Sequence, residues 1–366
     1  RSNAVDPVLL QDLLNFISAP DADEGAFNGM ALRLFEHQFK HNLPFQRVCQ
    51  QRGRTPRTVR DWREIPAVPI NAFKDLTLSA HPAPQCERVF MTSGTTRGDV
   101  RGKHHHPHLQ VYDLSMRLNF QRHIMKGADR MRIMVFFPNE DLMPNSSLAH
   151  YLALARTWFG TPNSSHYIDE QGLQLARAVE DLKQASEQSQ PVLLMGASYS
   201  LVHLMDALLA QGLRFKLPEG SRIMDTGGFK GQSRELSPSE FYRGLSEVFG
   251  VQAASCQNMY GMTELSTQFY DAGQQTQPVV KRGAHWIKTR VLDPLTGTEL
   301  PAGQVGVLAH TDLGNFNSVL TILTEDLGHV HADGFVLLGR AQGAQDRKST
   351  RLNSSHMSES RMPSSA

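Results

Sequence analysis

One stretch of the chain has the residue types that could hold the phosphates of a nucleotide. It runs from Met91 to Lys103 and reads MTSGTTRGDVRGK, with glycines set among small hydroxyl and basic residues. Glycine lets a phosphate approach the backbone, where amide N–H groups and hydroxyls donate and a basic side chain adds charge. The spacing is not that of a G-x-x-x-x-G-K-[ST] loop. By itself such a loop is more often a flexible turn, so the phosphate interpretation needs support from elsewhere.

A second polar turn, Gln257–Glu264, directly follows a strand that we expect over Val251–Ser255. Tyr260 could stack on a nucleotide base, Thr263 could donate to a phosphate, and Glu264 could hold Mg²⁺ through its carboxylate. A strand-to-helix turn capped by Thr263 explains this stretch equally well when it is taken alone.

Three shorter motifs add to these two. The segment Asp225–Gly231 reads DTGGFKG and follows a strand expected at Arg222–Met224. Its paired glycines would let a planar ring lie against the backbone. The other two motifs are TEDLG at 324–328 and LGR at 338–340. Both are weak alone, because an Asp before Leu-Gly is usually a turn former.

The elements that must position these turns alternate between strands and helices. Besides the two strands already named, buried strands are expected over Met131–Phe137 and Val192–Met195, and a helix is expected from Tyr199 to Ala210. Ligands of open α/β sheets bind at the carboxyl ends of the strands. The polar turns therefore fall where a site is expected.

The secondary structure that the sequence predicts changes along the rest of the chain. Helices should begin after Asp6 and Asp23, and from about Gly283 short strands are separated by Gly/Pro turns. We expect a large α/β body over residues 1–282 and a small β-rich subdomain over residues 283–345 that closes the nucleotide site. Residues 346–366 are rich in serine and lack apolar periodicity. They resemble translated adaptor sequence more than natural chain.

Composition excludes several classes of protein. The 366 residues carry 37 Lys+Arg and 36 Asp+Glu, a formal net charge of +1, which argues against nucleic acid or an anionic membrane as the main partner. No apolar run approaches the ~20 residues of a membrane-spanning helix. The 3 cysteines form neither a disulfide framework nor a zinc pattern. We expect a reduced, cytoplasmic enzyme.

In combination, the motifs resemble a known arrangement. The order TSGTT, GG, YGMTE, TED and GR is similar to that of the adenylate-forming superfamily of acyl-CoA synthetases and luciferases, from about residue 30 to residue 345. The finer match is to the acyl-protein synthetase family, which includes the fatty-acid-activating ligase of bacterial bioluminescence. It is carried by VPINAFKDL (68–76), MTSGTT (91–96), PNSSLAHYL (144–152), IMDTGGFKG (223–231), YGMTEL (260–265), WIKTRVLDP (286–294), LTEDLG (323–328) and LLGRAQGAQ (337–345).

The resemblance implies a large adenylate-forming α/β lobe in which the carboxylate of a fatty acid attacks the α-phosphate of ATP, giving an acyl-adenylate and pyrophosphate. Thr263 would meet the α-phosphate and Glu264 would bind Mg²⁺. Asp326 would accept from the ribose hydroxyls, and Arg340 would close over the ribose. The residues implied to hold the β- and γ-phosphates are Thr92, Ser93, Gly94, Thr95, Thr96 and Gly98. Those implied to enclose adenine or to line the same nucleotide site are Gly227, Gly228, Phe229, Tyr260 and Gly261.

Two departures from the family pattern matter. The usual loop continues with Gly and then Pro-Lys after TSGTT, whereas this chain has RGDVRGK at 97–103. This departure leaves open whether Arg97, Arg101 or Lys103 supplies the cation. The catalytic set that the resemblance implies is Thr263, Glu264 and Lys103, with Arg97 and Arg101 as alternatives to Lys103. Family members also continue into a C-terminal lobe with a catalytic lysine and, in the bioluminescence enzyme, an acyl-accepting cysteine. No Cys follows Cys256 here, so we expect that lobe to be absent from this copy and acyl transfer to be impaired.

The resemblance also implies a second step after activation. The acyl group would pass to a thiol, in close relatives a cysteine of the enzyme that is loaded before delivery to a partner reductase. A ligase that uses free coenzyme A is the alternative within the same class. A non-catalytic nucleotide-binding fragment is the alternative from another class.

Two other features favour structural interpretations. The segment His104–His108 reads HHHPH, and without a carboxylate or Cys partner at helical spacing we expect a solvated loop rather than a metal site. Cys256 could be a nucleophile, but we expect it to be a small buried hydrophobic residue.

Overall fold

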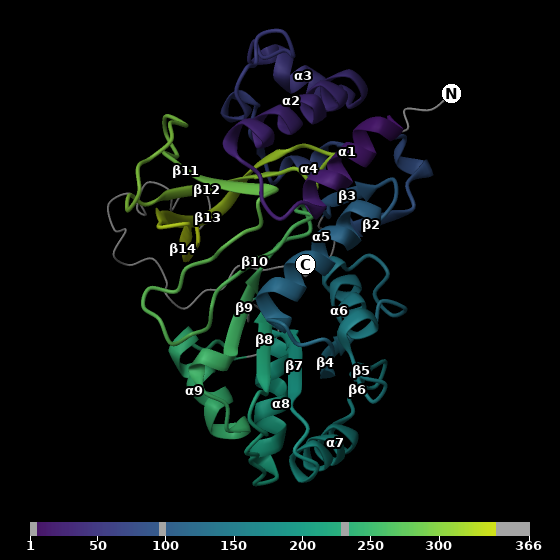
Figure 1. Ribbon diagram of the computed structural model, residues 1–366, viewed down its shortest axis with the longest axis vertical. Coiled ribbons are helices and arrows are strands. Elements are labelled where there is room, and N and C mark those ends of the chain that lie inside the picture. The colour runs from purple at the N-terminus through teal and green to yellow at the C-terminus, as the bar shows by residue number, and fades with distance from the viewer. Residues whose placement is uncertain (1–5, 95–99, 228–233, 342–366) are drawn as a thin grey trace. The chain divides into compact units, whose positions relative to one another are not determined.

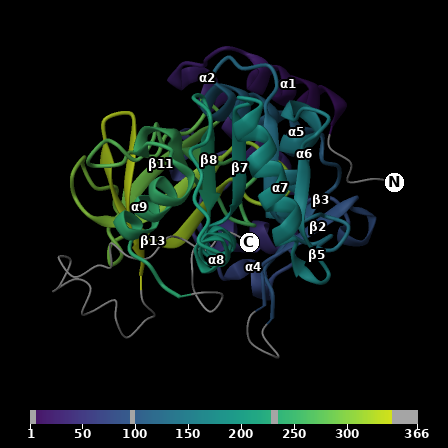
Figure 2. The ribbon, with the colours of Figure 1, turned by 90° about the horizontal axis from the view of Figure 1, so that it is seen from below.

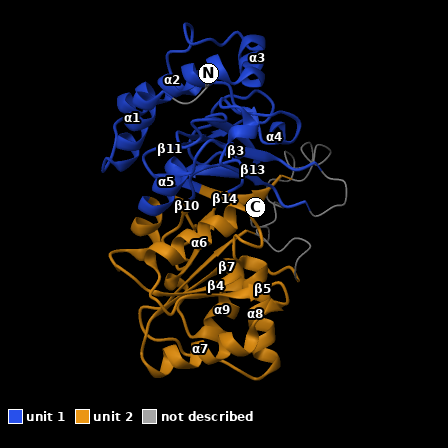
Figure 3. Cartoon of the chain, turned by 90° about the vertical axis from the view of Figure 1, so that its right-hand side faces the viewer, with its two compact units in different colours: residues 1–118, 262–268, 283–335 blue, residues 119–261, 269–282, 336–366 orange. Residues whose placement is uncertain are grey.

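The computed structural model describes residues 6–94, 100–227 and 234–341, which group into two compact units. Unit 1 comprises residues 1–118, 262–268 and 283–335, and unit 2 comprises residues 119–261, 269–282 and the chain from Val336 (Figure 3). The chain passes between the units several times, once inside the YGMTE motif. The expected boundary after residue 282 coincides with one of these crossings. The first 118 residues, which we expected in the α/β body, group with residues 283–335.

Unit 2 is built on a largely parallel sheet. Among the described residues its strand order is β10-β9-β8-β7-β4-β5-β6 (Figure 1). The five central strands β9, β8, β7, β4 and β5 pair in parallel in that order. The short strands β10 and β6 pair antiparallel with β9 and β5 and form the two edges. The bounds are β4 (Arg132–Pro138), β5 (Ser165–Asp169), β6 (Gly172–Leu173), β7 (Val192–Ala197), β8 (Arg222–Thr226), β9 (Cys256–Tyr260) and β10 (Phe269–Tyr270).

Helices cover both faces of this sheet. The helical elements of unit 2 are the π-helical turn η3 (Gln121–Met125), α6 (Ser147–Phe159), α7 (Leu175–Glu187), α8 (Ser198–Ala210), α9 (Pro238–Phe249) and the 3₁₀ turn η4 (Ala253–Ser255). The helix α8 lies between α7 and α9 (Figure 2), and all three share one core with strand residues such as Leu194 and Ile223. The helix α6 covers the other face, where Tyr151 lies 3.5 Å from the sulfur of Met224. Neighbouring residues of a strand point to opposite faces, so Met224 and Ile223 mark the two sides.

The apolar strands were correctly predicted, but one polar strand was not. Strands of a parallel sheet are buried on both faces and therefore appear as continuous apolar runs, as in β4 and β7. The strand expected over Val251–Ser255 is wrong, because this segment ends in η4 and the strand β9 starts at Cys256. The next residue, Gln257, is buried yet donates from Nε2 to the carbonyls of His123 at 3.0 Å and Asp271 at 2.7 Å. Hydrogen bonds of this kind allow a polar strand to lie inside the sheet.

Unit 1 begins with helices and continues into two smaller sheets. Its helices are α1 (Pro7–Ser18), α2 (Glu24–His41), α3 (Leu43–Gln51), α4 (Ala72–Asp75) and α5 (Gln110–Phe120), with 3₁₀ turns η1 (Trp62–Glu64) and η2 (Ala83–Gln85). The last two residues of α5 are grouped with unit 2. The first two begin where expected because Asp6 accepts a hydrogen bond from Val8 N at 2.9 Å, and Asp23 accepts one from Ala26 N at 2.7 Å. Such caps satisfy amide groups that the first helical turn leaves unpaired.

The larger sheet of unit 1 carries the β-rich part of the sequence. Its order is β1-β13-β12-β11, with β14 also paired to β13. The bounds are β1 (Val68–Pro69), β11 (Ile287–Leu292), β12 (Gly306–Asp312), β13 (Thr321–His331) and β14 (Gly334–Arg340). The TED motif lies inside β13 rather than in a turn. The division between the units falls within β14, after Phe335.

The smaller sheet is a two-stranded antiparallel ribbon of β2 (Arg88–Met91) and β3 (Lys103–His106). The expectation of a solvated histidine loop is therefore wrong. Pairing with β2 makes alternate residues of β3 face inward, and His104 and His106 are buried with ring centroids 4.1 Å apart. Strand pairing outweighs the polar character of the segment.

Candidate active site

The stretch proposed to cradle phosphates is the loop that closes the β2–β3 ribbon. The register pairs Met91 with Lys103. Beyond that pair, Thr92 N donates to Gly102 O at 2.9 Å, and Gly102 N donates to Thr92 Oγ1 at 2.9 Å. These two bonds fix both ends of the loop. Thr95, Thr96, Arg97 and Gly98 lie outside the described residues.

The three candidate cations of the loop differ in position. A Cβ placed on Gly94 would lie 2.8 Å from Arg101 Nε, so the Arg101 guanidinium lies against the backbone at the start of the loop. Lys103 is exposed and occupies the first position of β3. Alternation along the strand places it on the opposite face from His104. Arg101 is therefore the cation that the described structure brings next to the TSG segment.

The second half of the YGMTE motif lies beside this loop in unit 1. A Cβ on Gly102 would be only 3.2 Å from Glu264 Oε2, so the carboxylate lies directly against the Gly102 backbone. Glu264 and Thr263 are both buried. Among the described residues, the Thr263 hydroxyl has no hydrogen-bond partner. Burying an unpaired hydroxyl is unfavourable, which makes Thr263 a candidate for contact with a ligand oxygen.

Side chains far away in the sequence hold the YGMTE turn and the segment after it. His104 Nδ1 lies 2.8 Å from Thr263 O, and Asn315 Nδ2 donates to Glu264 O at 2.9 Å. Asp312 Oδ2 accepts from the amide groups of Ser266 and Thr267, each at 2.9 Å. The backbone around Thr263 and Glu264 is thus fixed from several sides.

The Asp312 carboxylate is fully buried and is surrounded by hydrogen-bond donors. Besides those two amide groups, it accepts from Thr267 Oγ1 at 2.8 Å and from Gly314 N at 2.9 Å. Burial raises the pKa of Asp312 to about 6, although these hydrogen bonds act in the opposite direction. Desolvation penalises the charged carboxylate more than the donors stabilise it.

The proposed ribose residues lie on neighbouring strands. Asp326 is buried in β13, and its amide group donates to Thr324 Oγ1 at 3.0 Å. Thr324 Oγ1 in turn donates to Leu308 O at 2.8 Å, which fixes this part of the strand. Arg340 is exposed at the end of β14 and belongs to unit 2.

In unit 2, the proposed adenine residues follow the carboxyl ends of β8 and β9. Gly227 directly follows β8 with φ +87°, a conformation that favours glycine. Tyr260 ends β9, where it is buried with its ring centroid 5.8 Å from that of Phe269. Gly261 follows Tyr260 and is also buried. Gly228 and Phe229 lie outside the described residues.

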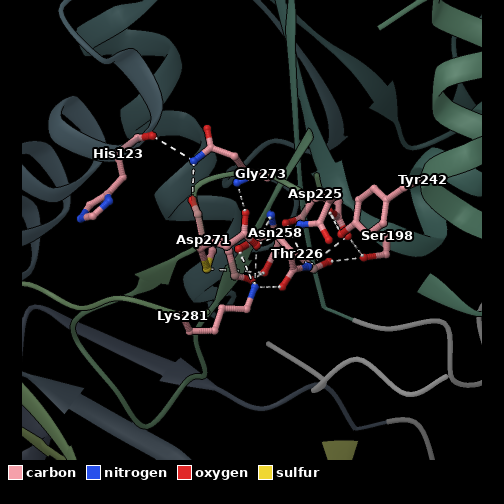
Figure 4. Close-up of polar contacts among 12 residues, drawn as sticks. His123, Ser198, Asp225, Thr226, Tyr242, Asn258, Asp271, Gly273 and Lys281 are labelled. Carbon is pink, nitrogen blue, oxygen red and sulfur yellow. Dashed lines mark hydrogen bonds and ion pairs between the residues drawn. The ribbon is translucent and has the colours of Figure 1, made fainter. Parts of the chain in front are cut away.

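A buried polar network connects these two strand ends (Figure 4). Asp225 accepts from Ser198 Oγ at 2.7 Å, from Tyr242 OH at 2.7 Å and from Asn258 Nδ2 at 3.1 Å. The three donors belong to α8, α9 and β9. Burial raises the pKa of Asp225 to about 6, against the effect of these hydrogen bonds and of the Lys281 charge.

Lys281 extends the network to the far side of β9. Its Nζ donates to Asn258 O at 2.8 Å, to Asn258 Oδ1 at 2.6 Å and to Asp271 Oδ2 at 3.0 Å. Asp271 also accepts from Asn258 N at 3.1 Å. Asn258 is therefore held between Asp225 and Lys281, two residues before Tyr260.

Sequence reasoning missed the residues that support the site, namely His104, Asn315, Asp312, Asp225 and Lys281. Asp225 was noted only as the first letter of DTGG, His104 was noted only as part of a histidine segment expected in solvent, and the other three lie outside any recognised motif. The expectation for Cys256 is confirmed, because it is fully buried and burial raises its pKa to about 12. A thiol in this state is a poor nucleophile.

The residues of the site would fit a magnesium ion that takes most of its ligands from water and phosphate oxygens. Among the described residues there is no group of three or more His, Cys, Asp or Glu side chains that could hold a metal ion. In nucleotide sites Mg²⁺ commonly takes one or two carboxylates and completes its shell with water and phosphate oxygens. Glu264, at the base of the phosphate loop, fits that requirement.

The layered α/β fold is that of the large lobe of adenylate-forming ligases. A solved structure of 2-hydroxyisobutyryl-CoA ligase in complex with 2-HIB-AMP and CoA has the same fold, with a TM-score of 0.60 and 14% sequence identity. The likeness covers 84% of this chain and 65% of that one, so this chain spans less than two thirds of its length. This confirms the expected fold class.

The chain belongs to the acyl-protein synthetase family LuxE, whose model matches residues 2–345. It is 22% identical over 303 residues to the long-chain-fatty-acid–luciferin-component ligase of Vibrio harveyi, covering 82% of this chain and 78% of that protein. It is 23% identical over 271 residues to the ligase of the same name from Aliivibrio fischeri, covering 73% and 69%. The chain is therefore a member of a ligase family. In the part of the chain that the structure describes, no helix has the length and apolar character needed to span a membrane.

Proposed function

We propose that this chain uses ATP and Mg²⁺ to activate a long-chain fatty acid as an acyl-adenylate and then transfers the acyl group to a thiol. The observation that carries the proposal is the Thr263 hydroxyl, which is buried without a partner among the described residues, next to Glu264 at the base of the glycine-rich loop. Membership of the acyl-protein synthetase family supports the type of reaction.

In the first step, a carboxylate oxygen of the acid attacks the α-phosphorus, and the bond to the bridging oxygen of the β-phosphate breaks. Pyrophosphate leaves with the electron pair. Negative charge is redistributed over the phosphate oxygens, so positioning and charge neutralisation do most of the catalytic work. Bound Mg²⁺ supplies part of that neutralisation.

The residues of the chain take distinct roles in this proposal. Thr263 donates its hydroxyl to an α-phosphate oxygen, and Glu264 holds the metal. Arg101 is preferred over Lys103 as the cation facing the β- and γ-phosphates, because it lies against Gly94. Asp326 and Arg340 bind the ribose, while Gly227 and Tyr260 contact adenine.

In the second step, a thiolate attacks the acyl carbon of the adenylate, and AMP leaves as a thioester forms. In the favoured pathway the thiol belongs to a protein cysteine. The acylated protein then transfers the acyl group to a reductase partner. Coenzyme A is the alternative acceptor. Mass spectrometry after incubation with ATP, a fatty acid and each acceptor separates the acyl-protein from the acyl-CoA outcome.

The activation step is tested by ATP–pyrophosphate exchange with straight-chain acids of increasing length. Thr263→Val removes the hydroxyl at nearly constant volume, and Thr263→Ser is the matched control that keeps it. We expect exchange with long-chain acids to fall at least about a hundredfold in the valine variant, the loss typical of removing a donor to developing charge. We expect the serine variant to retain most of the activity. Equal activity of the two variants would show that the hydroxyl has no part in the reaction.

A further inference from the structure

The histidine segment after the phosphate loop lies inside unit 1 and contacts the proposed catalytic turn. His104 is the second residue of β3, and only 1% of its surface is exposed. Its Nδ1 is 2.8 Å from Thr263 O, and its Nε2 is 3.2 Å from Ser318 Oγ. Both ring nitrogens are therefore engaged, one with the catalytic turn and one with the loop before β13.

The two contacts determine the tautomer of His104. A carbonyl oxygen can only accept, so Nδ1 must carry the proton that it donates to Thr263 O. Burial lowers the pKa of His104 to about 4, so the ring is neutral near pH 7. Nε2 is then an acceptor, and the Ser318 hydroxyl donates to it. The ring thus has a single orientation that satisfies both neighbours.

The residue directly before β3 reaches the turn at a second point. Gly102 directly precedes β3 and is joined to Thr92 by two hydrogen bonds, so it continues the ribbon and lies on the same face as His104, two residues later. Gly102 contacts the Glu264 carboxylate, and His104 contacts the Thr263 carbonyl. The end of the phosphate loop and the two proposed catalytic side chains are therefore fixed to each other through β3.

We propose that His104 is a positioning residue, which holds the Thr263 backbone so that the unpartnered hydroxyl is presented to the α-phosphate. This inference deepens the proposed function and rests on it. His104 does not touch the substrate itself. It acts through Thr263, in the way that a supporting hydrogen bond orients a group that binds the reacting atoms.

Two isosteric substitutions separate the two contacts of the ring. In His104→Asn, the amide Nδ2 takes the place of Nδ1, so the bond to Thr263 O can be kept while the Ser318 contact is lost. In His104→Gln, the amide reaches the position of Nε2, so the Ser318 contact is kept while the Thr263 bond is lost. Ser318→Ala removes the Ser318 contact without altering the ring.

The measurement is steady-state ATP–pyrophosphate exchange, with thermal unfolding as the check that each variant is folded. We expect kcat to fall about tenfold to a hundredfold in His104→Gln, as expected for a slightly misplaced reacting group, with little change in KM for ATP. We expect His104→Asn and Ser318→Ala to stay within about threefold of the wild type. A purely structural role would instead lower the melting temperature of both histidine variants and leave kcat of the folded fraction unchanged.

The outcomes distinguish this inference from the proposed function. If the wild type shows no exchange with any acid, the proposed function fails and the positioning role fails with it. If the wild type is active and folded His104→Gln is equally active, or if Asn is as damaging as Gln, only the positioning role is overturned. If neither histidine variant folds, a kcat loss in Ser318→Ala as large as that of Thr263→Val would also overturn it, while unchanged kcat there supports it.

Discussion

The Gly102 backbone lies against the Glu264 carboxylate, with only 3.2 Å between Oε2 and the position that a Cβ on Gly102 would take. The same Cβ would lie 3.3 Å from Thr92 Cγ2. A single methyl group at this point would therefore press on the proposed metal ligand and on the residue that closes the phosphate loop.

We predict that Gly102→Ala lowers ATP–pyrophosphate exchange by about tenfold or more and destabilises the fold by about 1–3 kcal/mol, the usual cost of overpacking a filled site. Gly29→Ala is the control, because Gly29 lies in α2 and has no atom within 4 Å of its Cβ position. That substitution should leave activity unchanged and raise stability slightly, since alanine favours a helix. Equal effects of the two substitutions on exchange would contradict the close contact.

A second prediction concerns the charge of Glu264. Glu264→Gln should abolish adenylate formation while leaving the fold intact, because an amide is a poor substitute for a carboxylate as a Mg²⁺ ligand. Exchange measured across a range of Mg²⁺ concentrations checks this, with circular dichroism as the test of folding. Wild-type exchange in the purified variant would exclude the metal role.

A third prediction tests the ribose assignment. Asp326→Ala should weaken ATP binding more than acid binding, because a carboxylate can accept from two neighbouring hydroxyls and each charge-assisted bond contributes roughly 1.5–3 kcal/mol. Calorimetric titration with ATP and with the acid gives the two affinities. An equal loss for both ligands, or no loss for ATP, would refute the assignment. Glu325→Ala, at the preceding position of β13, is the matched control and should have a smaller effect on the affinity for ATP.

A fourth prediction concerns the raised pKa of Asp225. Its ordinary value is 3.8 and its folded value is about 6, so between these pH values the folded state binds more protons than the unfolded state. The contribution of Asp225 to the free energy of unfolding is therefore largest below about pH 4 and decreases as pH rises through 6.

Urea denaturation of the wild type and of Asp225→Asn at pH 4, 5, 6 and 7 measures this effect. We expect the wild-type decrease in the free energy of unfolding over this interval to be reduced in the variant by about 1–3 kcal/mol. Asp312 has the same direction of shift and remains in the variant, so part of the pH dependence should persist. Identical pH dependence in the two proteins would show that Asp225 does not titrate in this range.

The sequence by itself determined the elements whose signals are local. Apolar runs identified β4 and β7, and the caps at Asp6 and Asp23 identified the first two helices. The glycine-rich loop and the YGMTE motif identified the candidate site, because the residue types needed for phosphate and metal binding are contiguous in the chain. These features depend on near neighbours, which a linear pattern records.

Only the tertiary structure decided how the site is supported. The strand β9 was missed because its polar residues are stabilised by Asp271 and Lys281, partners that lie outside the strand. The histidine segment was expected in solvent because its burial depends on pairing with β2 and on contacts with Thr263 and Ser318, 159 and 214 residues away. Whether a polar side chain is exposed or buried depends on partners that folding brings to it, and the local sequence does not contain them.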